Sequence, residues 1–210
     1  MGSIGHHDEG EHGTSMTAES GAGEKGSTKA WGGRFSTSPD ARSEAFTASI
    51  GFDHRMIRED IRGSVAHVRM LGRQRIIDPA EAEAIERGLW RIWEEVEEGT
   101  FSYSISDEDV HTAVERRLRD LIGPVQGKLH TARSRNDQVV TDLRLWTKGA
   151  IVSLASGVID LAQALLDRAA EHQDTIMPGY THTQRAQPVL LAHHFLAYVA
   201  MLERDLDRLQ

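Results

Sequence analysis

The sequence predicts an all-α protein, and three features of its apolar pattern support this fold class. Apolar residues recur at spacings of three and four along most of the chain, as on one face of an α-helix. One such pattern continues for about 35 residues, roughly three times the ordinary helix length, which implies a helical bundle. Only residues 101–105 alternate like a β-strand, and so short and isolated a segment supports no sheet.

Residues 1–28 have a different composition from the rest of the chain. They contain seven of the 19 glycines and no aromatic residue, and their five acids face one lysine. Such a segment buries too little apolar surface to offset its ordering entropy, so we expect a disordered tail. Three histidines in it (His6, His7 and His12) leave metal binding as the alternative.

Capping signals mark helix starts and ends in the body of the chain. After a helical pattern over 51–72, residues 78–81 (Asp-Pro-Ala-Glu) supply an N-cap, a first-turn proline and a capping-box acid. The helix they open should run to about Glu98. Another helix should begin near Ser106 and end at Gly123, and we expect all five prolines at element boundaries.

The two longest expected helices lie at the end of the sequence. One runs from about Asn136 to His172, and the next covers 188–210. The apolar face of the first is wider than one neighbouring helix could cover, which again indicates a bundle. Between them, residues 177–188 should form an unusually long helix–helix connection.

Two polar segments interrupt the amphipathic pattern. Residues 128–138 place arginines, hydroxyls and an asparagine directly before the longest helix. Donors at a helix N-terminus suit a carboxylate or phosphate, although a capped helix start with solvated arginines fits equally well. In the second segment, 177–188, His182 is either an acid–base group or a histidine that hydrogen-bonds within the connection.

The composition argues against several classes of protein. With 24 Lys and Arg against 32 Asp and Glu, the net charge of −8 argues against a nucleic-acid partner. The absence of cysteine excludes disulfides, thiolate nucleophiles and Cys-ligated zinc, and it favours the cytoplasm. The apolar part of the longest charge-free stretch, 186–202, is too short to span a membrane, so we expect a soluble protein with no membrane partner.

Five motifs in order resemble those of the argininosuccinate lyase family, within the fumarase/aspartase superfamily. They are Trp-Gly-Gly-Arg-Phe at 31–35, Phe-Thr-Ala-Ser-Ile at 46–50, Asp-Glu-Asp-Val-His-Thr-Ala-Val-Glu at 107–115, and the segments 128–146 and 178–188. The resemblance is to the N-terminal part of the family's enzymes. It implies an N-terminal helical lyase domain over 29–130 and the truncated start of a central long-helix bundle over 131–210.

The resemblance also implies a reaction, the reversible β-elimination of argininosuccinate to arginine and fumarate in arginine biosynthesis and the urea cycle. No cofactor and no metal are expected. Two alternatives remain open. One is a non-catalytic helical assembly protein of the crystallin kind, and the other is a related lyase with a different fumarate-releasing substrate.

The resemblance assigns roles to individual residues. Positions that match substrate-binding residues are Ser49, Ser134, Arg135, Asn136 and Thr181, and the position that matches the catalytic histidine is His182. The family's proton-abstracting serine lies in a loop further downstream, and no such loop occurs in these 210 residues. Family enzymes are homotetramers whose sites combine three subunits. We expect this chain alone to be inactive, because the expected proton-abstracting base is missing.

Overall fold

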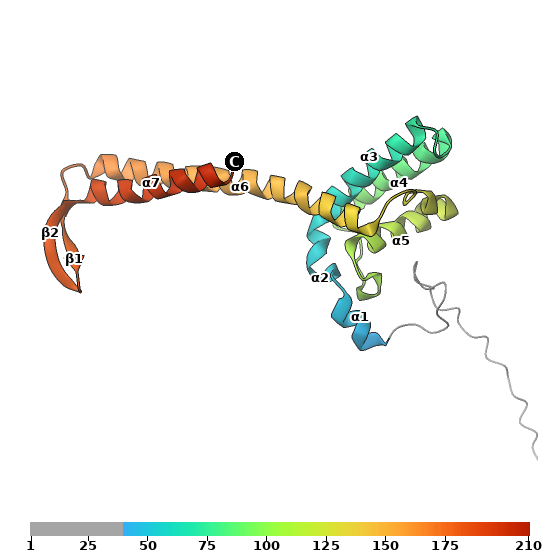
Figure 1. The fold of residues 1–210 in the computed structure, drawn as a ribbon, viewed down its shortest axis with the longest axis horizontal. Helices are drawn as coiled ribbons and strands as arrows, with labels where there is room; N and C mark the ends of the chain where they lie inside the picture. Colours follow the sequence, from blue (N-terminus) through green and yellow to red (C-terminus); the bar gives the residue numbers. More distant parts are fainter. Residues whose placement is uncertain (1–39) are drawn as a thin grey trace, which may run out of the picture. The chain divides into compact units, whose positions relative to one another are not determined.

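The computed structural model describes residues 40–210 (Figure 1). The expected tail over 1–28 and the motif at 31–35 lie outside the described residues. The helices and strands, in chain order, are α1 (Ala41–Thr47), α2 (Ile50–Asp53), α3 (Ile57–Arg73), α4 (Pro79–Glu97), α5 (Val110–Ile122), α6 (Arg135–Glu171), β1 (Ile176–Thr181), β2 (Gln184–Leu190) and α7 (Leu191–Arg208). Short 3₁₀ turns flank α3 and α5. The all-α prediction is therefore confirmed, with one hairpin added.

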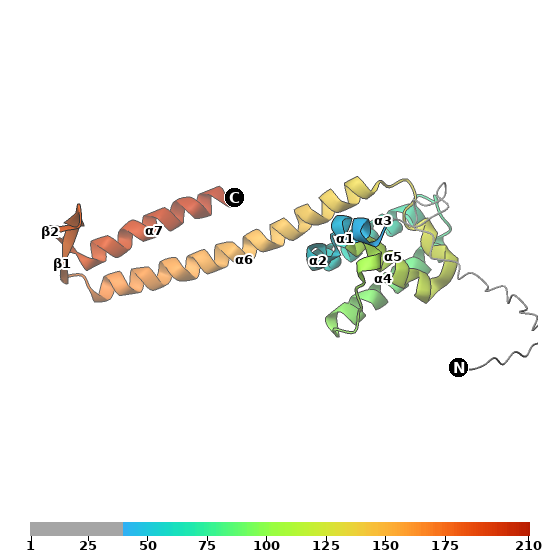
Figure 2. The ribbon, with the colours of Figure 1, turned by 90° about the horizontal axis from the view of Figure 1, so that it is seen from below.

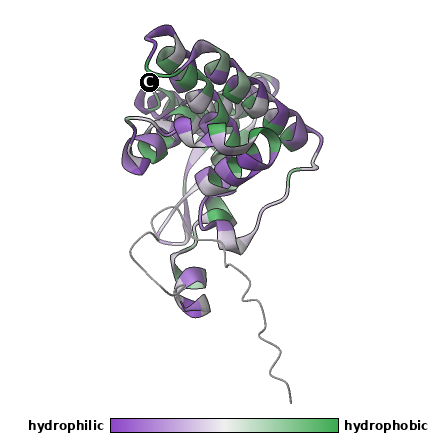
Figure 3. Cartoon of the chain, turned by 90° about the vertical axis from the view of Figure 1, so that its right-hand side faces the viewer, coloured by the Kyte–Doolittle hydropathy of each residue, from purple (hydrophilic) through white to green (hydrophobic). Residues whose placement is uncertain are grey.

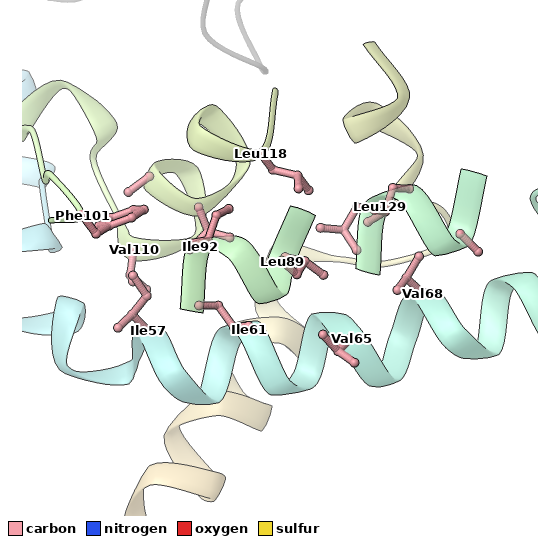
Figure 4. Close-up of a cluster of buried hydrophobic side chains, with 14 of the residues drawn as sticks. Ile57, Ile61, Val65, Val68, Leu89, Ile92, Phe101, Val110, Leu118 and Leu129 are labelled. Carbon is pink, nitrogen blue, oxygen red and sulfur yellow. The ribbon is translucent and has the colours of Figure 1, made fainter. Parts of the chain in front are cut away.

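Helices α3, α4 and α5 enclose the hydrophobic core (Figure 4). Fully buried members of this core include Ile61, Leu89, Ile92 and Leu118. The helices approach closely, because a Cβ atom at Gly88 of α4 would lie 2.5 Å from Leu118 Cδ1 of α5. A methyl group there would force neighbouring side chains to move.

The N-cap predicted for α4 is confirmed, but the predicted capping-box acid, Glu81, pairs with Lys128 instead, and α5 begins later than predicted. Asp78 has an extended backbone and its carboxylate accepts a hydrogen bond from the backbone N–H of Ala80 at 2.8 Å. The predicted start of α5 at Ser106 is wrong. That residue lies in a 3₁₀ turn, and α5 begins at Val110 because Asp109 accepts from the backbone N–H of Thr112 at 2.7 Å.

The longest predicted helix is confirmed as α6, which contains 37 residues. Helix α7 runs back along it, as both side views show (Figures 1 and 2). Green and purple residues alternate along the helical ribbons, as expected of amphipathic helices (Figure 3). Among the described residues, α6 is the one helix long and apolar enough to cross a membrane by length and composition, and a single helix of this kind is weak evidence for a membrane span.

The segment between α6 and α7 differs from the predicted connection. It forms an antiparallel β-hairpin in which Ile176 pairs with Leu190 and Thr181 pairs with Gln184. Pro178 and Pro188 face each other within the hairpin, so the prediction that every proline marks an element boundary is wrong for these two. Both strands of a two-stranded hairpin are edge strands. An edge strand tolerates proline, because the N–H that proline lacks need not pair with another strand.

Candidate active site

The start of α6 lies in the first of the two predicted polar segments. Ser134 is the N-cap, and its Oγ accepts a hydrogen bond from the backbone N–H of Asn136 at 3.2 Å. The carboxylate of Asp137 accepts in return from the backbone N–H of Ser134 at 2.7 Å. This capping box fixes the helix start. Ser134 and Asn136 are exposed, so polar side chains and the positive end of the helix dipole meet the solvent here.

Arg135 is held at this helix start by acids from the α5 region. Its Nη1 lies 3.1 Å from Glu115 Oε1, and its Nε lies 3.7 Å from Asp109 Oδ2. Nη1 also donates to Gln138 Oε1 at 2.9 Å. The side chain remains 32% exposed. An incoming carboxylate would therefore meet a guanidinium whose position is already fixed.

Ser49 is tied to the loop that precedes α5. The backbone N–H groups of Ser49 and Ile50 donate to the carbonyl oxygen of Glu108 at 2.7 and 3.0 Å. Glu108 has a left-handed backbone, with φ of 67°. The next residue, Asp109, is the one that pairs with Arg135. Three motifs that are far apart in the sequence thus converge near the start of α6.

Thr181 and His182 lie at the tip of the hairpin. Because Thr181 pairs with Gln184, the turn consists of His182 and Thr183 alone. Both have left-handed backbones, with φ of 49° and 62°, as a two-residue hairpin turn requires. Neither is glycine, so the turn stores backbone strain, a feature often found at functional sites. His182 is exposed to the solvent.

Helix α6 separates the two groups of predicted site residues. At a rise of about 1.5 Å per residue, its 37 residues span about 55 Å. Ser134, Arg135 and Asn136 lie at its N-terminus, and the hairpin that carries His182 follows its other end (Figures 1 and 2). Within one copy of the chain, the structure does not bring His182 to Arg135.

A buried polar cluster formed by Asp60, His111 and Asp142 lies next to the start of α6. Imidazole Nδ1 of His111 lies 2.8 Å from Asp60 Oδ1 and 3.5 Å from Asp142 Oδ2. Gln138 donates from Nε2 to the same Asp60 oxygen at 2.5 Å. The three residues of this buried cluster come from α3, α5 and α6, and within residues 40–210 they are the one group that places three potential metal ligands together.

Burial and mutual charge set the protonation of the buried cluster. Burial together with the charge of Asp60 raises the pKa of Asp142 to about 8. Burial acts to raise the pKa of Asp60 as well, but the hydrogen bond and charge of His111, together with the hydrogen bond of Gln138, lower that pKa overall. For His111, burial acts to lower the pKa, whereas the hydrogen bond and charge of Asp60 raise it overall.

Sequence reasoning missed the partners that hold Arg135. Glu115 lies within a quoted motif, but its contact depends on the tertiary structure that brings a side chain of α5 to the first residue of α6. Gln138 and Asp142 are four positions apart in α6, and polar residues at this helical spacing beside apolar neighbours could have indicated a buried network. Asp60 and Ser64 have the same spacing in α3.

A protein-family model described as "Lyase" matches residues 33–210 of this chain. A curated argininosuccinate lyase of Symbiobacterium thermophilum is 57% identical over 181 residues. That alignment covers 86% of this chain and 39% of the relative, so the chain spans about two fifths of the relative's length.

Solved structures share the fold. An EDDS lyase variant with bound fumarate is 29% identical with a TM-score of 0.61, over 82% of this chain and 37% of that one. A fumarate lyase:delta crystallin from Brucella melitensis has a TM-score of 0.65 at 17% identity, over 80% of this chain and 44% of that one. The second likeness concerns the fold alone.

Proposed function

Since this chain belongs to the lyase family matched over residues 33–210, we propose that it is the N-terminal part of an argininosuccinate lyase. The observation that carries the proposal is the 57% identity to a curated argininosuccinate lyase. The reaction is the reversible β-elimination of argininosuccinate to arginine and fumarate, a carbon–nitrogen lyase step of arginine biosynthesis. We also propose that the enzyme is soluble and located in the cytoplasm.

The start of α6 suits the anionic part of this reaction. Removal of a proton next to a carboxylate builds negative charge on that carboxylate, which preorganised donors stabilise. Ser134, Arg135 and Asn136 supply a hydroxyl, a guanidinium and an amide at a positive helix end, and Ser49 is tied to the same region. We assign these four residues to substrate binding.

The hairpin tip supplies the second part of the proposed site. We assign Thr181 to substrate binding and His182 to the acid–base chemistry, in which its imidazole holds or transfers a proton near neutral pH. The strained two-residue turn favours the assignment, since left-handed non-glycine residues persist where function requires them.

The proposed site needs more than one copy of the chain. The two groups of residues lie about 55 Å apart along α6, so a complete site takes them from different copies. Exposed apolar residues on α6 (Val152, Leu154, Ile159 and Leu161) supply a surface for such an assembly, which we propose to be a homotetramer.

Turnover of argininosuccinate tests the function. The coding frame is first followed beyond Gln210, and any protein of the relatives' length that carries this chain is purified beside the 210-residue chain. We expect fumarate from argininosuccinate with the longer protein and none with the 210 residues alone. Comparable turnover of adenylosuccinate or aspartate would identify a related lyase instead.

The His182→Asn substitution separates the enzyme from a non-catalytic assembly protein of the crystallin kind. The enzyme requires a loss of turnover of about a hundredfold or more with the helical content unchanged. Thr183→Ser at the neighbouring turn position is the matched control, and it should retain most of the activity. Full activity of the His182→Asn protein would contradict the assigned role.

A further inference from the structure

The buried cluster contains carboxyl oxygens that no hydrogen bond satisfies. Asp142 is 0% exposed, and neither of its side-chain oxygens has a hydrogen-bond partner among the described residues. Asp60 Oδ2 and the nearby Ser64 Oγ are buried and unpartnered in the same way. Two ionised carboxylates in this place would face one imidazole and the charge of the Arg133 guanidinium, which makes no hydrogen bond to Asp142. Buried charge of this kind destabilises the folded state unless a proton or a cation balances it.

A proton fits the geometry better than a metal ion. The His111 Nδ1 to Asp60 Oδ1 distance of 2.8 Å is that of a direct hydrogen bond. A tetrahedral ion with ligands at about 2.0–2.1 Å holds those ligands roughly 3.3 Å apart. The backbone of α3 also passes close to Asp142 at Gly63, where an added Cβ atom would lie 3.2 Å from Asp142 Oδ1. A proton on Asp142 turns one carboxyl into a donor and needs no additional space.

Gln138 connects the buried cluster to Arg135. Its Oε1 accepts from Arg135 Nη1 at 2.9 Å, while its Nε2 donates to Asp60 Oδ1 at 2.5 Å. Both bonds fix the orientation of the amide, because only the oxygen accepts and only the nitrogen donates. The position of the Arg135 guanidinium therefore depends on the position of a buried carboxylate in α3.

We propose that the buried cluster is a positioning site that carries a proton on the carboxyl of Asp142 and, through Gln138, fixes the guanidinium of Arg135 at the start of α6. The relevance of this device to catalysis rests on the proposed function, whereas the proton and the connection do not. Asp60, His111 and Asp142 are positioning residues here, since none of them faces the solvent at the helix start.

The charged groups around Asp142 determine the expected pH dependence. Asp60 faces it from α3, His111 from α5, and Arg133 from the turn before α6, while Asp109 and Arg135 act on His111. Because the folded state raises the pKa of Asp142 to about 8, it holds a proton that the unfolded chain releases near pH 4. Stability should therefore fall as the pH rises from about 4 to about 8, and His111 adds in the same direction.

The first test follows the thermal unfolding of the 210-residue chain between about pH 6 and about pH 9. The wild-type chain should lose several degrees of Tm over this range, and Asp142→Asn should lose much less because its amide cannot ionise. Asp120→Asn, which changes an exposed acid on α5, is the matched control and should behave like the wild type. Equal pH slopes for the wild type and Asp142→Asn would overturn the proposal.

A measurement on the wild type covers the case in which Asp142→Asn does not fold. Infrared spectroscopy of the native chain near pH 7 should show the band of a buried protonated carboxyl, which disappears above about pH 9. Absence of that band would overturn the proposal. Stoichiometric retention of zinc or magnesium after extensive dialysis would overturn it too, because the cluster would then bind a cation.

The second test concerns the connection to Arg135. NMR exchange of the Arg135 side-chain N–H groups should be about tenfold faster in Gln138→Ala, as expected when a charged hydrogen bond is lost. Gln163→Ala, at an exposed position of α6, is the control and should leave the rate unchanged. Unchanged exchange in Gln138→Ala would contradict the connection. Since neither test uses turnover, an inactive longer protein would reject the proposed function alone.

Discussion

Two groups of helices use the same amphipathic pattern with opposite results: the core helices α3, α4 and α5, and the pair α6 and α7. Among the core helices the apolar faces meet one another, so Ile61, Leu89 and Ile92 are completely buried. In α6 the apolar face is wider than α7 can cover, and Leu154 remains 56% exposed. The first region is completed within one chain, whereas the second has an unoccupied packing surface. Apolar periodicity thus predicts a helix but does not say which molecule covers it.

The largest expected difference between the two regions comes from leucine truncation. Leu89→Ala removes a fully buried side chain and should lower the free energy of unfolding by about 2–5 kcal/mol. Leu154→Ala on α6 is the matched control in the 210-residue chain, where it should cost less than about 0.5 kcal/mol. Chemical denaturation monitored by circular dichroism measures both. Equal losses would contradict the contrast drawn between the regions.

An ion pair between α4 and α5 should make the stability of the core helices fall at acidic pH. Arg117 donates to both carboxylate oxygens of Glu95 at 2.7 and 2.8 Å, and this hydrogen bonding lowers the pKa of Glu95. The stabilisation is therefore present above the ordinary glutamate pKa and is lost as the pH falls below about 4.5. Glu95→Gln should cost about 1–3 kcal/mol at pH 7.

The same denaturation experiment at about pH 3 provides the check on Glu95. There the difference between Glu95→Gln and the wild type should be smaller than at pH 7, because this pH lies below the ordinary glutamate pKa and the stabilisation from the lowered pKa decreases as the pH falls. The exposed Glu83→Gln serves as the control and should change little at either pH. A difference that stays as large in acid would show that the pair acts through packing.

The close approach of α4 and α5 should also resist added volume. Gly88→Ala places a methyl group against Leu118 Cδ1, and the repacking should cost about 1–3 kcal/mol. In α6, Gly157→Ala has nothing within 4 Å and should be neutral or slightly stabilising, because alanine favours the helix. Melting temperatures of the two variants compare the regions directly. A stabilised Gly88→Ala protein would contradict the close packing.

The smallest expected effect concerns the start of α4. Asp78→Ala removes the carboxylate that accepts from Ala80 and should cost about 1 kcal/mol. Asp78→Asn keeps an acceptor oxygen and should cost less, so the pair distinguishes the cap from a general charge effect. Hydrogen exchange of the first-turn amides reports the loss locally. Equal protection in all three proteins would exclude a capping role.

Local signals predicted much of this structure. The capping residues around Asp78 and the apolar periodicity of α6 predicted helices that the structure contains, because both depend on neighbours within one or two turns. The hairpin around His182 was missed, because Pro178 and Pro188 were expected at element boundaries. The alternation of apolar and polar residues that would mark two paired strands is also absent from this segment.

In the candidate site, too, the features that depend on neighbouring residues could be predicted, and those that depend on tertiary structure could not. The capping box at Ser134 could be read from a few consecutive residues. The contacts of Arg135 with Glu115 and Asp109 could not, because they join residues about 20 to 26 positions apart that only the tertiary structure brings together. Assignments for Ser49, Thr181 and His182 came from resemblance to a family, and they remain predictions.

Mixing two inactive variants tests the central claim, that one site draws on opposite ends of α6 from different copies. Arg135→Ala and His182→Asn would each be introduced into a protein of the relatives' length that carries this chain, and the two would be unfolded and refolded together. The account predicts that each variant alone produces no fumarate from argininosuccinate, whereas the mixture regains a substantial fraction of wild-type turnover. A mixture as inactive as its components, although it forms mixed oligomers, would contradict the account.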